Sequence, residues 1–162
     1  KLSDFGCSYN EKGMKSMYVQ SRCYRAPEVI LGFPVTSKVD IWSFACVIAE
    51  IATGKLLFNG QTEEEQLMLY ASVIGPPPQK LLEASPKAKE IYDGAGRVKR
   101  VLSSKRVGAC ARPLEKILKC DPLCISFVQY CLVWDPAKRP SAEELHDHPF
   151  IKQNIECPFL KI

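Results

Sequence analysis

The sequence contains no long hydrophobic stretch. Its apolar residues never run for the roughly 18 positions that a membrane-spanning helix requires. The chain opens with Lys1-Leu-Ser-Asp4, which lacks the apolar core of a secretory signal. These absences predict an intracellular protein, cytoplasmic or nuclear, that has no membrane partner.

Metal-binding patterns are missing as well. The chain has eight cysteines and two histidines, and no two cysteines are spaced as Cys-x-x-Cys. Cys120 and Cys124, with His146 and His148 downstream, match no common zinc pattern. A helical metal-binding protein is therefore the weakest functional interpretation. Without a secretory signal, we expect the thiols to be reduced.

The excess of positive charge is small. A net charge of +4 does not indicate a nucleic-acid partner. The positive charge gathers in residues 80–119, which hold 11 Lys or Arg against 4 Asp or Glu. Such a stretch is most often a solvated face, with docking to an acidic partner as the alternative. The sequence leaves the oligomeric state open.

The sequence does contain a succession of helical patterns after a polar start. Residues 1–25 predict a long loop, and long loops in compact domains are often functional. Residues 37–54 are apolar almost all round and end in glycine, which predicts a buried central helix. Thr62 is the expected N-cap of a further helix, and Ser141 with Glu144 forms a capping box. The other expected elements are helices at 26–32, 63–74, 79–92, 121–133 and 141–146, an irregular insert at 93–113 and a packed or frayed tail from 152.

Five short motifs follow one another along this pattern. Asp4-Phe5-Gly6 combines a carboxylate, an aromatic residue and a glycine hinge, which suits a group that holds Mg²⁺ against phosphates. Ala26-Pro27-Glu28 begins 22 residues after Asp4. The other three motifs are Asp40-Ile-Trp42-Ser43, Trp134-Asp-Pro-Ala-Lys-Arg139 and His148-Pro-Phe150. A single tripeptide is weak support for a function, but five motifs in order are strong support.

In this order and spacing the motifs resemble the landmarks of the C-terminal lobe of eukaryotic protein kinases. The resemblance implies a mainly α fold: the helical C-lobe of the protein-kinase-like fold, preceded by its activation segment, with the N-lobe and catalytic loop absent. Residues 1–150 would be a partial protein kinase domain, made of an activation segment at 4–28 and a helical body at 29–150. An insert typical of the CMGC group of kinases would span about 76–120, and residues 151–162 would form a C-terminal tail.

The subfamily is also indicated. The run Tyr18-Val-Gln-Ser-Arg22-Cys-Tyr-Arg25 is similar to that of the dual-specificity tyrosine-phosphorylation-regulated kinases (DYRK), which belong to the CMGC group. Glu65-Gln-Leu67, Gly75-Pro-Pro and Cys120-Asp-Pro-Leu are similar to the same family. Homeodomain-interacting kinases share the Tyr-x-Gln-Ser-Arg run and are the alternative.

The resemblance assigns regulatory roles to the activation segment. It implies that Tyr18 is autophosphorylated and that Arg22 and Arg25 hold the phosphate through charge-assisted hydrogen bonds. The family often has a second tyrosine where this chain has Ser16, so a single phosphotyrosine is expected. Ser21 would lie near the phosphoacceptor of Ser/Thr protein substrates, often with a following proline.

Structural roles follow from the same resemblance. Glu28 should pair with Arg139 in a buried bidentate bond that ties Ala26-Pro27-Glu28 to the helical body. Asp40 should accept backbone N–H bonds from a catalytic loop that these residues do not include. Trp42 is expected to be a structural residue of the central helix.

Phosphoryl transfer needs further groups that this sequence lacks. The 162 residues contain no glycine-rich phosphate loop and no His-Arg-Asp catalytic loop. The resemblance therefore implies that no catalytic residue is present, and that the general base and the ATP-binding lysine lie upstream of Lys1. Within the sequence, Asp4 is the one residue expected to contact the metal and the cofactor.

We therefore predict a fragment of an ATP-dependent serine/threonine (dual-specificity) protein kinase that uses ATP and Mg²⁺ when complete. The isolated chain should be inactive and bind neither cofactor tightly. The alternative is a truncated kinase-like interaction module that binds protein partners.

Overall fold

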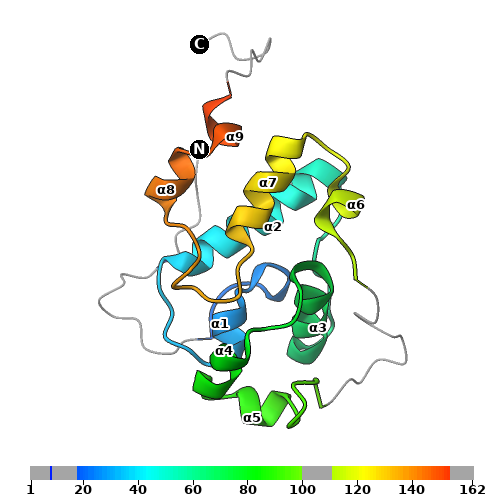
Figure 1. The fold of residues 1–162 in the computed structure, drawn as a ribbon, viewed down its shortest axis with the longest axis vertical. Coiled ribbons are helices and arrows are strands. Elements are labelled where there is room, and N and C mark those ends of the chain that lie inside the picture. The colour runs from blue at the N-terminus through cyan, green and yellow to red at the C-terminus, as the bar shows by residue number, and fades with distance from the viewer. Residues whose placement is uncertain (1–7, 9–17, 100–110, 154–162) are drawn as a thin grey trace.

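The computed structural model describes residue 8, residues 18–99 and residues 111–153. Within these ranges the protein is helical and has no strand; Tyr92 and Val98 form an isolated antiparallel bridge. A 3-10 turn spans Arg22–Tyr24. The α-helices are α1 (Pro27–Leu31), α2 (Lys38–Thr53), α3 (Glu63–Ile74), α4 (Gln79–Ala84), α5 (Ala88–Ile91), α6 (Leu114–Leu118), α7 (Pro122–Cys131), α8 (Ala142–His146) and α9 (Pro149–Lys152) (Figure 1). The predicted mainly α fold is confirmed.

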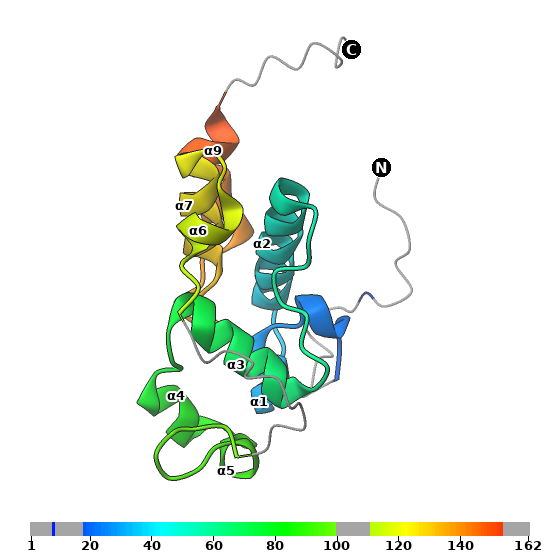
Figure 2. The same ribbon diagram turned by 90° about the vertical axis from the view of Figure 1, so that its right-hand side faces the viewer.

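Helix α2 is the central helix against which several other elements pack. It contacts α7, α6 and the 3-10 turn; α7 runs beside it, and α3 crosses below at a steep angle (Figures 1 and 2). It ends at Gly54, which has a left-handed backbone (φ 68°) that glycine adopts at no steric cost. One face is buried through Val39, Ile41, Trp42, Ala45, Cys46 and Ala49.

An aromatic cluster joins α2 to α3 and to the segment after α7. The ring of Tyr70 lies edge-on to Trp42 at 4.9 Å and to Phe58 at 4.6 Å, measured between ring centroids. Trp134 meets the same tyrosine at 5.9 Å, and its indole N–H donates to the carbonyl of Gly75. All four rings are buried, and aromatic pairs at these separations favour edge-to-face contacts.

The predicted helix over 79–92 is wrong in one respect: it is two helices. The chain breaks at Ser85, whose backbone is extended because the following Pro86 disfavours a helical residue before it. The Ser85 hydroxyl donates to the carbonyl of Leu31 at 2.8 Å and accepts from the N–H of Ala88 at 3.0 Å. The break therefore attaches the connection between α4 and α5 to the end of α1.

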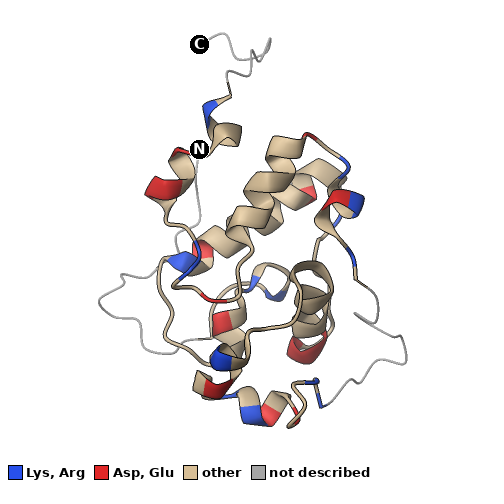
Figure 3. Cartoon of the chain, viewed as in Figure 1, with Lys and Arg blue, Asp and Glu red and all other residues tan. Residues whose placement is uncertain are grey.

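Other boundaries also differ from the prediction. Helix α7 ends at Cys131 rather than near Val133, and α6 lies in a region for which no helix was predicted. Helix α9 spans the position where the helical body and the tail were predicted to meet, and that domain boundary stays a prediction. The insert helices α4 and α5, and α6, carry charges of both signs, whereas α7 carries none (Figure 3).

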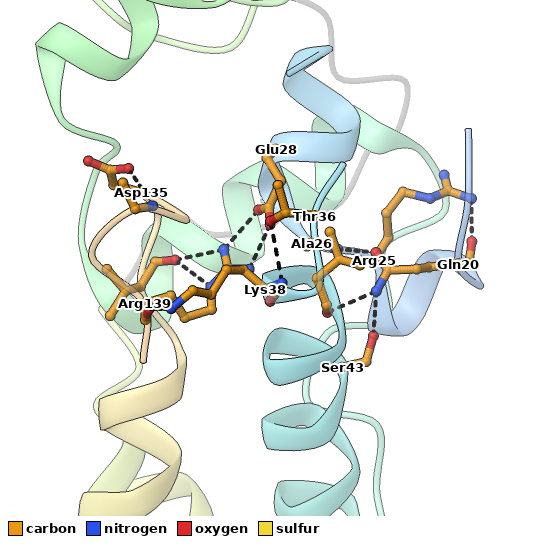
Figure 4. Close-up of polar contacts among 12 residues, drawn as sticks. Gln20, Arg25, Ala26, Glu28, Thr36, Lys38, Ser43, Asp135 and Arg139 are labelled. Carbon is orange, nitrogen blue, oxygen red and sulfur yellow. Dashed lines mark hydrogen bonds and ion pairs between the residues drawn. The ribbon is translucent and has the colours of Figure 1, made fainter. Parts of the chain in front are cut away.

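A buried ion pair closes the helical body. Arg139 donates from Nη1 to Glu28 Oε1 at 2.7 Å and from Nη2 to Glu28 Oε2 at 2.8 Å, and neither side chain is more than 1% exposed. The guanidinium also donates to the carbonyls of Lys38 and Val133, which brings its hydrogen bonds to five (Figure 4). These bonds match the five N–H donors of the guanidinium, so none of its own donors is left without a partner. The pair expected from the resemblance is present.

We expect Arg139→Ala to lower the free energy of unfolding by about 3–5 kcal/mol, because it leaves the buried carboxylate of Glu28 unpaired. Urea denaturation measures the change. Lys152→Ala is the matched control, since it removes an ion pair to Asp147 that is largely exposed on both sides. The control should leave the urea midpoint unchanged. A loss below about 1 kcal/mol in Arg139→Ala would mean that the pair contributes no more than a surface pair.

The opposite face of α2 is apolar and largely exposed in the described structure, although the Phe44 ring meets Phe127 of α7 at 5.9 Å between ring centroids. Phe44, Val47 and Ile51 lie at helical spacing on it and are 42%, 39% and 75% exposed. A contiguous exposed apolar face favours association. We expect the 162-residue chain to bind a hydrophobic dye and to self-associate, and the double variant Val47→Lys, Ile51→Lys to reduce both at least threefold.

Dye fluorescence and sedimentation velocity provide the readouts. Ile151→Lys, at an exposed apolar position on α9, is the matched control and should change neither. A dye-free monomer of the unsubstituted chain with a sharp cooperative melt would contradict this interpretation of α2.

Candidate functional site

Residues 18–25 form a turn of chain that contacts α2 and α3, and Arg25 holds it together. The Arg25 side chain is buried although it carries a charge. Its Nε donates to the carbonyl of Val19 at 3.0 Å, and its Nη2 donates to the carbonyl of Gln20 at 2.8 Å. Its Nη1 donates to the Tyr18 hydroxyl at 2.6 Å and to Glu63 Oε1 at 3.1 Å. One guanidinium thus binds four positions of the chain.

Tyr18 meets Arg25 in two ways. Besides the hydrogen bond to its hydroxyl, the guanidinium carbon lies 3.9 Å from the centroid of the Tyr18 ring, which is a cation–π contact. The tyrosine is nevertheless 69% exposed. Its hydroxyl is therefore reachable from solvent while lying directly beside a fixed positive charge.

Gln20 has a backbone that side chains rarely adopt. Its φ is +68°, in the left-handed region, where a β-carbon is disfavoured. Its side-chain amide makes three bonds: Nε2 donates to the carbonyl of Val39 at 3.0 Å and to Ser43 Oγ at 2.6 Å, and Oε1 accepts from the N–H of Ala26 at 2.9 Å (Figure 4). The strained residue is therefore held on both its backbone and its side chain.

Tyr24 and Tyr70 attach the end of the segment to the helices. The Tyr24 hydroxyl donates to the Glu50 carboxylate on α2 at 2.6 Å, and this hydrogen bond to a negative group raises the pKa of the tyrosine above its ordinary value. The Tyr70 hydroxyl on α3 donates to the carbonyl of Arg25 at 2.7 Å. Burial raises the pKa of Tyr70 as well, so the phenol stays protonated and keeps donating.

Arg22 lies apart from Tyr18. It is exposed, and its Nε donates to the carbonyl of Gly60 at 2.9 Å. Gln66 completes this contact, because its amide donates to the Arg22 carbonyl and accepts from the Gly60 N–H. A β-carbon at Gly60 would come within 2.7 Å of the Gln66 backbone nitrogen, so only glycine fits there. Of the two arginines predicted to serve Tyr18, the structure places Arg25 against it.

The first residues of the chain lie outside the described part of the structure. Asp4, the predicted metal and cofactor residue, is among them, and so is the rest of its tripeptide. Lys1, upstream of which the general base and the ATP-binding lysine were expected, is outside the described residues too. The expectation of no catalytic residue within the 162 positions therefore stays a prediction, and so does the role of Asp4.

The remaining predicted residues are distributed as follows. Ser21 is exposed beside Gln20, and Ala26 and Pro27 are buried at the start of α1. Asp40 is exposed in the first turn of α2. Trp42 is fully buried, and its indole N–H has no hydrogen-bond partner within the described structure.

Sequence reasoning missed three residues of this site. Gln20 and Ser43 stood inside motifs that were recognised, but no role was given to either. Glu63 was included only as the first residue of a predicted helix, whereas it is the ion-pair partner of Arg25. The contacts that reveal these three residues are tertiary. Each hydrogen bond joins residues 19 to 38 positions apart, and spacing along the chain does not show such pairs.

Chemically, this arrangement positions a chain segment through a buried guanidinium. Among residues 18–99 and 111–153, no three His, Cys, Asp or Glu side chains gather to hold a metal ion. No helix in the described parts of the chain is long and apolar enough to cross a membrane. The charged centre is a guanidinium beside an exposed phenol, which suits the recognition of an anion on that phenol.

Comparisons with known proteins identify relatives of the chain. The protein kinase domain family matches residues 1–151. The chain is 39% identical to the DYRK-family kinase pom1 of Schizosaccharomyces pombe, over 98% of this chain and 15% of that protein. It is 37% identical to human dual specificity tyrosine-phosphorylation-regulated kinase 3, over all of this chain and 31% of that protein.

A solved structure shows the same likeness. The crystal structure of a kinase domain matches with a TM-score of 0.80 and 34% identity, over 94% of this chain and 47% of that one. The chain spans between 15% and 32% of the length of these and similar curated relatives. The family match along nearly the whole sequence and the kinase neighbour in structure show that this chain belongs to the protein kinase family, with the DYRK kinases as its relatives.

Proposed function

We propose that the chain is part of an ATP-dependent serine/threonine kinase of the dual-specificity type, and that Tyr18 is the residue at which this kinase phosphorylates itself. The observation that carries the proposal is the contact between Tyr18 and Arg25. An exposed phenol lies 2.6 Å from a buried guanidinium nitrogen, so a phosphate added there meets a positive charge that is already fixed. Within the complete kinase, ATP and Mg²⁺ would be the cofactors, and Asp4 would hold the metal.

The physical effect of the phosphate follows from its charge. Phosphorylation adds about −1.5 to −2 charges. Charge-assisted hydrogen bonds to a fixed guanidinium contribute roughly 1.5–3 kcal/mol each, enough to offset the ordering of one or two residues. Arg25 directly precedes Ala26-Pro27-Glu28, and Glu28 is bound to Arg139. The phosphate would thus be linked through Arg25 to the rigid helical body.

Glu63 would compete with the phosphate for Arg25. Its carboxylate already pairs with Nη1 of Arg25 at 3.1 Å and is about one third exposed. A phosphate on Tyr18 would share this nitrogen, and two negative groups around one cation repel each other. We propose that the ion pair with Glu63 holds Arg25 in place before phosphorylation, and that this ion pair weakens once the phosphate also binds Arg25. Arg22, bound to Gly60, would be the second and lesser cation.

Ser21 would face the substrate in this proposal. It is exposed and directly follows the strained Gln20. The backbone carbonyl of Gln20 accepts a hydrogen bond from Arg25, so it is not available to accept one from a substrate. The proposed substrates are proteins with a Ser or Thr phosphoacceptor, often followed by proline.

The phosphorylation of Tyr18 is tested in the complete kinase. We expect Tyr18→Phe and Arg25→Lys each to lower activity at least tenfold, because lysine lacks the planar fork that binds several oxygens at once. Arg22→Lys should cost less. The double variant Tyr18→Phe, Arg25→Lys should be little worse than Arg25→Lys alone, since that change already removes the guanidinium that the phosphate on Tyr18 would meet.

Mass spectrometry and a peptide assay provide the readouts. Tyr130→Phe removes a hydroxyl from another exposed tyrosine, on α7, and should leave activity unchanged. Finding Tyr18 unmodified in a fully active enzyme would end the proposal.

Residues 1–162 alone should transfer no phosphate, because they contain neither a glycine-rich phosphate loop nor a His-Arg-Asp loop. A single carboxylate at Asp4 would also bind Mg²⁺ weakly, since this ion relies on phosphate ligands and retained waters. Incubation of the purified chain with labelled ATP and a peptide measures transfer directly. Asp4→Asn distinguishes the chain from a contaminating kinase: robust transfer that Asp4→Asn abolishes would contradict the prediction.

A further inference from the structure

We infer that Ser43 is a positioning residue of this kinase, which acts through the side chain of Gln20 to shape the segment beside the substrate. The inference rests on the proposed function and assigns a role to a hydroxyl on α2 that has none so far. Ser43 and Gln20 lie 23 positions apart, and Figure 4 shows them side by side at the start of α2.

Gln20 needs a restraint from outside its own segment. Its left-handed φ of +68° is unfavourable for a residue with a β-carbon, and such a conformation persists only where the surroundings hold it. The backbone carbonyl is held by Nη2 of Arg25 at 2.8 Å. The side chain is held by α2 and by the first N–H of the Ala26-Pro27-Glu28 motif.

The orientation of the Gln20 amide is unambiguous. Its oxygen faces the N–H of Ala26, which can only donate, and its nitrogen faces the carbonyl of Val39, which can only accept. Reversing the amide would place two donors together and two acceptors together. Both hydrogens of the amide nitrogen therefore point to α2, one to Val39 and one to Ser43.

Ser43 is the side chain that α2 contributes to this arrangement. Its hydroxyl accepts from Gln20 Nε2 at 2.6 Å and donates to the carbonyl of Tyr24 at 2.8 Å. It thus joins both ends of the turn formed by residues 20–24. The other contact of the Gln20 nitrogen on α2 is a backbone carbonyl, which no substitution of Val39 removes. The neighbouring Trp42 is fully buried, so the helix presents the Ser43 hydroxyl from a rigid position.

A specific consequence follows. Removing the hydroxyl leaves one amide hydrogen of Gln20 and the Tyr24 carbonyl without their partner. The Gln20 amide can then turn away from Ala26, and the left-handed backbone next to Ser21 relaxes. In this inference that backbone faces the residue after the phosphoacceptor, so the selectivity for that residue falls while the rest of the kinase stays folded.

The first arm of the test uses the 162-residue chain. We expect Ser43→Ala to speed hydrogen exchange of the Ala26 amide at least tenfold. The matched control is Ser72→Ala, which removes a buried helical hydroxyl whose bond runs to the Leu69 carbonyl on α3. The control should leave exchange at Ala26 unchanged. Equal exchange at Ala26 in both variants would overturn the inference.

The second arm uses the complete kinase and two peptides that differ only in having Pro or Ala after the phosphoacceptor. Ser43→Ala should lower the ratio of their kcat/KM values at least fivefold, and Gln20→Glu should do the same. The double variant should be no worse than Gln20→Glu alone, because that change already removes the amide nitrogen that donates to Ser43. Ser43→Thr keeps a hydroxyl, so its ratio of kcat/KM values should equal that of the unsubstituted kinase. Ser72→Ala should not change it, because general destabilisation affects both peptides equally.

The outcomes separate the inference from the proposed function. Faster exchange at Ala26 with an unchanged peptide ratio would show that Ser43 serves stability alone, and would contradict its positioning role. A complete protein that phosphorylates no peptide would refute the proposed function. The exchange arm would still decide whether Ser43 holds Gln20.

Discussion

The buried pair between Glu28 and Arg139 is the interaction on which the rest of the structure depends. The two residues are 111 positions apart, and neither charge has access to water. Either charge alone would be severely destabilising in this position, so the chain must bring both ends of the helical body together. The same guanidinium reaches the carbonyls of Lys38 and Val133, and the start of α2 and the end of α7 meet there.

The pair also determines where the functional segment lies. Glu28 is in the first turn of α1, and Ala26 and Arg25 precede it without a break. Fixing α1 therefore fixes the point at which the segment 18–25 leaves the helical body. Gln20 and Tyr24 then attach the segment to α2. The guanidinium of Arg25 binds the carbonyls of Val19 and Gln20, which bends the start of the segment back toward Arg25. The segment owes its shape to polar contacts with buried helices, because few of its own side chains are buried.

Local rules predicted the elements whose causes are local. Helix α3 has the expected bounds, and the Thr62 hydroxyl caps it by accepting from the N–H of Glu65. The capping box of Ser141 and Glu144 is present at α8. Helix α2 also lies where its apolar pattern placed it, although one of its faces is exposed. Capping and apolar spacing act within a few residues, so the sequence shows them directly.

The contacts that shape the site are not of this kind. The bond between Glu28 and Arg139 came from a family resemblance, and no periodicity shows it. The left-handed Gln20 is a residue type that ordinarily avoids this conformation, and bonds to Arg25, Ser43, Val39 and Ala26 hold it there. The bond of Arg22 to Gly60 was likewise invisible in the spacing that paired Arg22 with Tyr18. Domain boundaries within the chain, including the extent of the insert, stay a prediction.

The central claim is that the helical body, and not the segment itself, orders residues 18–28. Native-state hydrogen exchange of the 162-residue chain in rising denaturant tests it most directly, because it measures the opening free energy of each amide. The account predicts that the amides of Tyr24, Arg25 and Ala26 open together with the buried core of α2, with similar opening free energies and similar dependence on denaturant. Fast exchange at these three amides while α2 stays protected would contradict it.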